Sequence, residues 1–302
     1  MARTKDPHAA TVKAWETRKR GTVREREQRL NGPVSSVKEL AGGISETYKV
    51  TLEDGTVGNF KLQGRHQVGG PETEVAAWEV AKLVGMEDMV PAASVREIDL
   101  GVQLRGSSGT HRGSFAEWQE GTPAIDVAVM QDPDASFIDS EVAFGDSEHD
   151  VMRAAMFDYI IGNQDRHPGN WVVDAGKVRL IDHNDALGEF PYSLFLDRVN
   201  RRPAMANKSV ASYVKPYLDK LPHILAAVRA AAPGRLGASS LRPSEAMARW
   251  GATRAVALEA RVGRAASATT WRDFLDGMGI KEQIPSGLPK PSGPHGFGRA
   301  SS

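Results

Sequence analysis

Three oxygen-bearing side chains near the middle of the chain have types and spacing suited to phosphate chemistry. Asp165 is followed five positions later by Asn170, and Asp182 comes twelve positions after that. Phosphoryl transfer uses a carboxylate that orients the attacking hydroxyl, and an Asn and an Asp that hold Mg²⁺ on the phosphates. Magnesium favours few protein oxygens completed by phosphate oxygens. The same residue types also form ordinary turns, so their partners upstream must decide between the two interpretations.

The flanking sequence predicts the elements that would position these side chains. Residues 151–161 have apolar side chains at helical spacing and precede a glycine that can end a helix. After the loop that contains the Asp and the Asn, residues 171–173 and 178–181 predict two strands of a hairpin. Because a hairpin brings its two ends together, we expect Asn170 and Asp182 to face one cation.

A lysine and a glutamate upstream would supply the other half of such a site. Lys61 lies in the second strand of an expected hairpin, 57–62, and Glu74 lies on a predicted helix, 72–84. A strand lysine paired with a helix glutamate holds the α- and β-phosphates in phosphoryl-transfer enzymes. Glu72 competes with Glu74 for this role, and solvent-facing positions are the ordinary alternative for such residues.

A short glycine-containing segment precedes that hairpin. Gly42, Gly43 and Ser45 could form a loop whose backbone amides approach phosphate. The pattern is neither G-x-G-x-x-G nor a P-loop, which requires G-K-[S/T]. A simple turn is the alternative, and the segment gains interest from its place ahead of Lys61.

Together these segments resemble the phosphatidylinositol 3-/4-kinase-like branch of the protein kinase-like superfamily. The similarity is greatest to bacterial and phage members related to actin-fragmin kinase and to the persistence-toxin kinases. The Asp-Arg-His-x-x-Asn element is fairly specific to this branch, whereas ordinary protein kinases carry His-Arg-Asp. The resemblance extends over residues 38 to 190, and the stretches that carry it are Phe60-Lys61, Glu74 to Trp78, Arg112 to Trp118, Gly162 to Trp171 and Ile181-Asp182.

The resemblance implies an α+β, two-lobed protein kinase-like fold. The N-terminal lobe would be an antiparallel β lobe with one helix, and the C-terminal lobe would be mostly helical. Helical spacing over 209–232, which Pro216 and Pro222 are expected to break, and over 243–264 predicts helices that complete the second lobe. The expected divisions are a basic arm at 1–33, disordered or a solvated helix; an N-terminal lobe and hinge at 34–120; a catalytic lobe at 121–282; and a disordered tail at 283–302.

The resemblance also implies a role for each matching residue. Lys61 would contact the α- and β-phosphates of ATP, and Glu74 would orient Lys61. Asp165 would be the catalytic aspartate that receives or orients the acceptor hydroxyl. Asn170 and Asp182 would be the Mg²⁺ ligands.

The resemblance also bears on the connection between the lobes and on the two residues after Asp182. Residues Ser114 to Gln119, Phe115 and Glu117 among them, would form the connection, where backbone amide and carbonyl groups read adenine. Many family members have Phe-Gly after the metal-binding aspartate, whereas this chain has His183-Asn184. This departure leaves the ligand in place and puts the usual behaviour of the activation segment in doubt.

We therefore expect an ATP- and Mg²⁺-dependent kinase that transfers the γ-phosphoryl group to a hydroxyl. We favour Ser or Thr of a protein over a lipid acceptor, because the sequence has no evident membrane-binding segment. A catalytically inactive, phage-type scaffold with a kinase fold and a kinase-fold adenylyltransferase are the two alternatives. Residues that hold ATP survive such changes of chemistry, so the motif predicts the cofactors better than the product.

The composition is that expected of a cytoplasmic enzyme. The 302 residues are 40% hydrophobic and 25% charged, which suits one two-lobed unit with a sizeable core. The absence of cysteine excludes disulfides and Cys-based zinc sites, and no run of about 18 apolar residues predicts a membrane span. With 38 basic and 38 acidic residues a generally basic nucleic-acid binder is not expected, and only the basic stretch Lys13 to Arg29 could contact nucleic acid.

Overall fold

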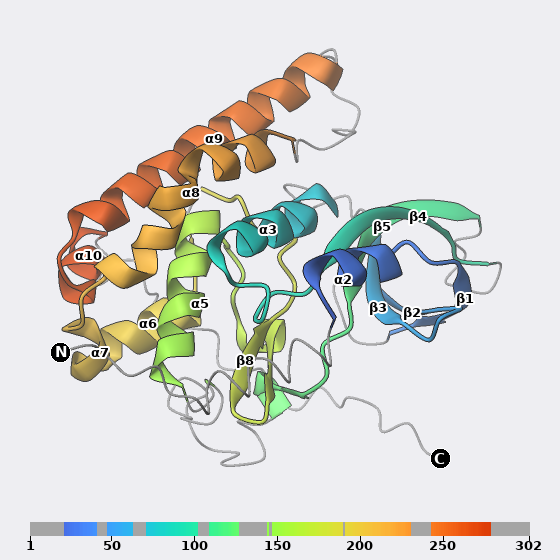
Figure 1. Cartoon of the computed structure of the whole chain (residues 1–302), viewed down its shortest axis with the longest axis horizontal. Helices are drawn as coiled ribbons and strands as arrows, with labels where there is room; N and C mark the ends of the chain where they lie inside the picture. The colour runs from blue at the N-terminus through green and yellow to red at the C-terminus, as the bar shows by residue number, and fades with distance from the viewer. Residues whose placement is uncertain are drawn as a thin grey trace, which may run out of the picture.

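The structure, a computed structural model, places most strands in one lobe and most helices in the other (Figure 1). The N-terminal lobe holds a five-stranded antiparallel sheet of order β1-β2-β3-β5-β4, and the predicted two-lobed α+β fold is confirmed. The described residues are 21–40, 47–62, 71–101, 109–126, 144, 147–189, 191–230 and 243–278, with the backbone alone for 243–250. The strands are β1 (Val34–Glu39), β2 (Thr47–Leu52), β3 (Val57–Leu62), β4 (Ala93–Asp99) and β5 (Thr110–Glu117).

Alternation along β3 decides which side chains face the second lobe. Phe60 is fully buried in the sheet core, and its neighbours Asn59 and Lys61 point to the opposite face. Gly58 lies on the core face, where a Cβ would collide with the ring of Phe115. The close approach of that ring therefore requires glycine in this strand and fixes the register that presents Lys61.

Helix α3 (Pro71–Val84) covers this lobe and confirms the helix predicted over 72–84. Its buried face carries Ala76, Ala77, Trp78, Val80 and Ala81. Small side chains on that face allow the helix to lie close to its neighbours, and α3 contacts β4, β5 and α8.

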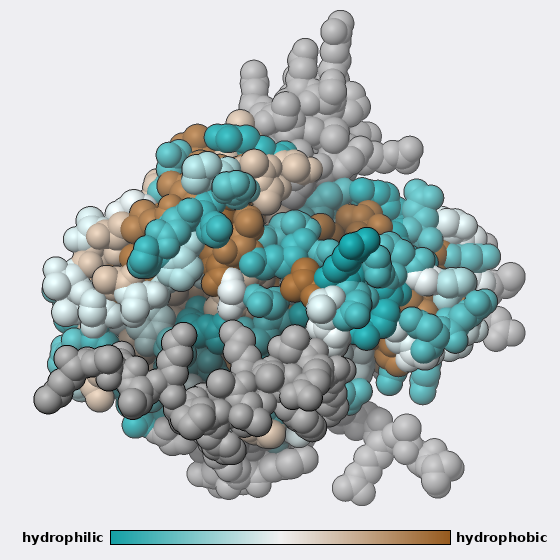
Figure 2. All heavy atoms as spheres, in the orientation of Figure 1, coloured by the Kyte–Doolittle hydropathy of each residue, from teal (hydrophilic) through white to brown (hydrophobic). Residues whose placement is uncertain are grey.

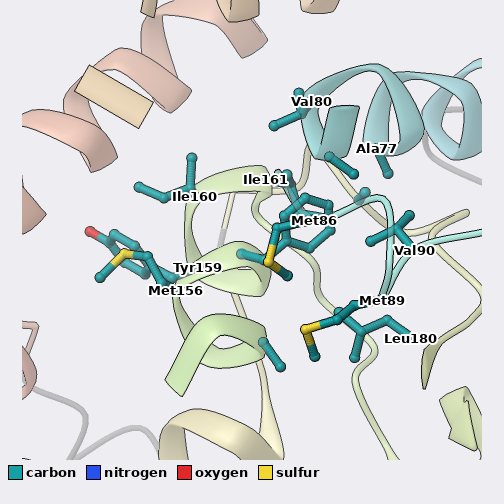
Figure 3. Packing of buried hydrophobic residues seen from close by; sticks show 14 of the residues in the cluster. Ala77, Val80, Met86, Met89, Val90, Met156, Tyr159, Ile160, Ile161 and Leu180 are labelled. Atoms are coloured by element: carbon teal, nitrogen blue, oxygen red, sulfur yellow. The ribbon is translucent and has the colours of Figure 1, made fainter. Parts of the chain in front are cut away.

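One continuous core joins the two lobes. Figure 3 shows side chains of α3, of the segment that follows it, of α5 and of β8 around one space. The backbone N–H of Leu180 on β8 donates to the carbonyl of Met89, 2.8 Å away, so the second lobe is also hydrogen-bonded to the first. The labelled members of this core include Ala77, Val80, Met86, Met89, Val90, Ile161 and Leu180.

The C-terminal lobe confirms the predicted order of helix, loop and hairpin. Helix α5 ends at a left-handed glycine, Gly162, as its sequence predicted. The hairpin joins β6 in a three-stranded antiparallel sheet of order β6-β7-β8. The elements up to this sheet are β6 (Thr122–Pro123), α5 (Glu148–Ile161), a 3₁₀ turn η2 (Pro168–Asn170), β7 (Trp171–Asp174) and β8 (Lys177–Leu180).

The later helices were predicted with one error. Helix α8 runs unbroken from Ala211 to Ala230, although Pro216 and Pro222 were expected to interrupt it. Packing of α8 against α9 and α3 outweighs the two lost backbone hydrogen bonds. The remaining helices are α6 (Leu194–Arg201), α7 (Pro203–Ala206), α9 (Pro243–Ser267) and α10 (Trp271–Gly277).

The described part of the basic arm is a packed helix, which corrects the expectation of a disordered or solvated arm. Helix α2 (Val23–Arg29) begins with a capping box between Thr22 and Glu25. Arg26 is 3% exposed and donates to Glu117 Oε2 at 2.6 and 3.0 Å. Its guanidinium is therefore held within the fold and cannot serve nucleic-acid binding. Residues 1–20 and the predicted tail at 283–302 lie outside the described residues.

The surface is mixed in character. Figure 2 shows mainly hydrophilic residues over α2 and the sheet, and more hydrophobic ones toward α8 and α9. The exposed large hydrophobic side chains of the described ranges are Ile125, Leu218 and Val256. Among those ranges, no helix combines the length and the apolar character that crossing a membrane would require.

Candidate active site

A cavity of about 510 Å³ lies between the sheet and the hairpin of the second lobe. Lys61 and Glu74 line it from the first lobe, and Ile181 and Asp182 line it from the second. The connection between the lobes, from Glu117 to Gly121, closes a third side. Gly42, Gly43 and Ser45 lie outside the described residues, so their predicted approach to phosphate stays a prediction.

Lys61 and Asp182 form an ion pair across this cavity. The ammonium Nζ contacts Asp182 Oδ2, with 11% of the lysine side chain and 30% of the aspartate side chain exposed. Burial by itself would raise the pKa of Asp182, but the Lys61 charge and hydrogen bond, with smaller effects of His183 and Arg166, hold that pKa below its usual value. Asp182 therefore stays ionised, as a cation ligand must.

The expected pair of Lys61 with Glu74 is absent, because Glu74 is occupied elsewhere. Glu74 Oε2 accepts from the backbone N–H of His183 at 2.8 Å, and its Oε1 lies 3.2 Å from the His183 ring Nδ1. Glu72, the competing candidate, lies 2.5 Å from Arg112. A buried carboxylate takes the nearest donors, and His183 supplies them here.

The loop after α5 presents Asp165 to the solvent side of the site. Half of the Asp165 side chain, 51%, is exposed. Asn170 is buried and its amide Nδ2 donates to the Asp165 backbone carbonyl at 2.7 Å, with a longer contact of 3.4 Å to Oδ2. His167 Nδ1 accepts from the N–H of Gly169 at 3.0 Å, so this imidazole shapes the loop. Asp165 Oδ2 also lies 3.6 Å from His167 Nε2, and the half-exposed carboxylate can still contact an incoming group.

A buried ion pair that sequence reasoning missed supports this loop. Arg166 and Asp158 are both fully buried, and the guanidinium donates to both carboxylate oxygens at 3.0 to 3.2 Å. The same guanidinium also donates to the backbone carbonyls of Asn170 and Ile181. Arg166 therefore fixes the backbone at Asn170 and at Ile181, the residue directly before Asp182. The signal was Asp158, a charged residue among the apolar positions of the helix.

Asp185 is a second missed residue at the site. Burial raises its pKa above the usual value, and the negative charges of Asp165 and Asp182 add to the effect, while Lys61 opposes it. Its carboxylate therefore lies within the electrostatic influence of both Asp165 and Asp182, and it was not among the residues predicted from the sequence.

Replacement of Asp185 by Asn is expected to stabilise the unliganded protein in a pH-dependent way. Because the folded-state pKa of Asp185 is raised, its ionisation costs stability as the pH rises through that pKa. The variant should be more stable by on the order of 0.5 kcal/mol near neutral pH. The difference should vanish below about pH 3, where the carboxyl is protonated in both states. Urea unfolding across this range measures it, and a gain that grows toward low pH would contradict the assignment.

The connection between the lobes differs from expectation in one residue. Phe115 is fully buried in the sheet core, pairs with both β3 and β4 and does not line the cavity, so its predicted nucleotide contact is not supported. The N–H groups of Glu117 and Trp118 donate to the carbonyls of Ala92 and Val57 at 2.8 and 3.0 Å. These two N–H groups are therefore not available to a base, and the hinge N–H groups from Gln119 onward are the candidates that remain.

Two of the three comparisons with known proteins found similar proteins. The family model for phosphatidylinositol 3- and 4-kinase matches residues 148–199, which hold α5, the loop, the hairpin and most of α6. No curated protein matches the chain at a significant level. The structure of the Golgi casein kinase with Mn and ADP bound is similar with a TM-score of 0.51 and 14% identity, over 86% of this chain and 77% of that one. A second Golgi casein kinase structure gives a TM-score of 0.49 and 13% identity, over 85% and 77%.

Proposed function

We propose that this chain, which has a phosphatidylinositol 3-/4-kinase-like protein kinase fold, transfers the γ-phosphoryl group of ATP to a hydroxyl with the help of Mg²⁺. The observation that carries the proposal is the meeting of Lys61 and Asp182 in a cavity between two lobes, beside the hairpin that also begins at Asn170. A phosphotransferase needs a cation for phosphate, oxygens for a metal and an open carboxylate for the acceptor at one place.

The nucleotide would lie in the 510 Å³ cavity, a volume typical of small-molecule sites. The similar Golgi casein kinase was crystallised with Mn and ADP, which supports nucleotide and divalent-metal use in this fold. The base would approach the hinge beyond Trp118, whose ring lies 4.5 Å from the Lys49 ammonium. The phosphates would then lie near Lys61.

The chemistry of the side chains fits a hard divalent cation. Asn170 and Asp182 offer an amide and a carboxylate oxygen at the two ends of one hairpin. Among the described residues, no three His, Cys, Asp or Glu side chains gather as a metal site. Phosphate oxygens would therefore have to complete the coordination, as Mg²⁺ prefers. A bound cation would offset the negative charge that develops on the transferred group.

Asp165 would act on the acceptor. Its half-exposed carboxylate can orient a hydroxyl and accept its proton, while the Arg166–Asp158 pair holds the loop in place. Such catalysis is mainly positioning and electrostatics. We propose a Ser or Thr of a protein as the acceptor and a cytoplasmic location, and the protein substrate implied in the name Golgi casein kinase agrees with this choice.

Intact-mass spectrometry of the chain and of casein after incubation with Mg²⁺-ATP tests the proposal. A phosphoryl adduct on either protein would support it. An adenylyl adduct would instead identify an adenylyltransferase with the same fold. Binding of ATP with no adduct on any acceptor tried would favour the scaffold alternative.

Replacement of Asp182 by Ala is expected to weaken Mg²⁺-dependent ATP binding by at least about tenfold, because the only carboxylate of the proposed ligand pair is lost. Titration calorimetry with and without Mg²⁺ measures this effect. Asp174→Ala, at the turn of the same hairpin and outside the cavity, is the matched control. Equal affinity of the native and Asp182→Ala proteins for Mg²⁺-ATP would refute the ligand assignment.

A further inference from the structure

His183, which follows the proposed metal ligand Asp182, is hydrogen-bonded to α3 and does not face solvent. The His183 side chain is fully buried, and its ring packs edge-on against Phe157 with centroids 5.8 Å apart. Its backbone N–H and its ring Nδ1 both contact the Glu74 carboxylate, at 2.8 and 3.2 Å. Glu74 itself is 4% exposed. The nearly buried Glu74 carboxylate thus has two contacts with His183.

A second bond ties the same loop to the same end of α3. Thr73 is fully buried, and its hydroxyl donates to the backbone carbonyl of Asn184 at 2.8 Å. The Asn184 amide Nδ2 in turn donates to Asp182 Oδ1 at 3.1 Å. The loop therefore contacts two successive residues of α3, and one loop side chain reaches back to the Asp182 carboxylate.

The backbone of Asp182 shows why such ties are needed. Asp182 has a φ of 58°, in the left-handed region that favours glycine. A non-glycine residue keeps this conformation only where its surroundings hold it. The bonds from Glu74 and Thr73 to the next two residues provide that hold on the C-terminal side, and Arg166 provides it at Ile181 on the N-terminal side.

We propose that Glu74 is a positioning residue for Asp182, acting through His183, and does not orient Lys61. The inference rests on the proposed function only in naming Asp182 as a metal ligand. In the described structure the lysine has Asp182 as its partner, and the glutamate has His183. We call the Glu74–His183 contacts the latch. Through the latch, the position of α3 determines the position of Asp182, whereas Lys61 forms no ion pair with Glu74 and is not affected.

The two possible roles of Glu74 predict opposite results for Glu74→Ala. If Glu74 acts through the latch, affinity for an ATP analogue should fall by about tenfold with Mg²⁺ and stay unchanged with EDTA. If Glu74 orients Lys61, the metal-free affinity should fall as well. Glu79→Ala, on an exposed part of the same helix, is the control and should alter neither affinity.

Hydrogen exchange of the unliganded protein separates this inference from the proposed function. Exchange in the peptide that contains residues 181–185 should rise at least about tenfold in Glu74→Ala and stay native-like in Glu79→Ala. His183→Phe, which keeps a ring but removes the ring nitrogen, should show a smaller rise in the same peptide. Unchanged exchange there in Glu74→Ala would overturn the latch, whether or not the protein binds ATP. Native protein that fails to bind Mg²⁺-ATP would overturn the proposed function and leave the exchange result to decide on the latch.

Discussion

Asp165→Asn is expected to abolish measurable phosphoryl transfer while nucleotide binding persists. The amide cannot accept the acceptor's proton, and loss of such a group lowers rates by about 10²- to 10⁴-fold. The fold should tolerate the change because the main anchor of the loop is the Asp165 backbone carbonyl, which accepts from Asn170 at 2.7 Å, and the carboxylate contact is the longer one. Single-turnover transfer to the acceptor measures the rate.

Binding and folding controls make this result specific. Affinity for Mg²⁺-ATP should stay within about threefold of the native value, because Asp165 is not among the residues that line the cavity. Asp174→Asn, at the hairpin turn, should retain full transfer. Undiminished turnover in Asp165→Asn would remove this residue from the catalytic role.

Asp158→Ala is expected to cost about 3 to 5 kcal/mol of unfolding free energy, because it leaves the fully buried Arg166 guanidinium without its counter-charge. It also removes the acceptor for the Ser193 hydroxyl, at 2.7 Å, and for the Asn163 amide, at 3.1 Å. Urea unfolding measures the loss. A cost of this size is a large share of the stability of an ordinary domain, so partial unfolding at 37 °C should accompany it.

A substitution in a surface ion pair is the control for the unfolding measurement on Asp158→Ala. Asp219 pairs with Lys215 one turn away on α8, and both side chains are more than half exposed. Asp219→Ala should change the unfolding free energy by less than about 1 kcal/mol. Similar costs for the two substitutions would show that the Arg166–Asp158 pair does not support the loop as the structure indicates.

Local patterns explain what could be predicted from the sequence. The β7–β8 hairpin, which places the Asn170 carbonyl 3.1 Å from the Ile181 N–H, followed from alternation and turn residues. The helix over 72–84 followed from its helix formers. These signals lie within a few residues of each other along the chain. The resemblance to bacterial and phage members stays a prediction, since the matched family segment and the shared fold do not bear on it.

Partners far apart in sequence could not be predicted in the same way. Nothing local indicates that Lys61 contacts Asp182, or that Glu74 accepts from His183, 109 positions later. Each choice depends on which donors the packed lobes bring near a buried carboxylate. Helix α2 did carry a local signal, the Thr22 to Glu25 capping box, but its neighbouring charges suggested a solvated arm.

The hydrogen bonds of Arg26 limit the order in which the first lobe can fold during synthesis. The guanidinium needs the Glu117 carboxylate and the carbonyls of Glu87 and Val90, which lie 61 to 91 positions later in the chain. Helix α2 is synthesised before β5, so Arg26 cannot form these bonds until Glu117 has also left the ribosome. A nascent chain paused before residue 117 would therefore lack the carboxylate that holds Arg26 in place, 4.8 Å from the centre of the Trp78 ring.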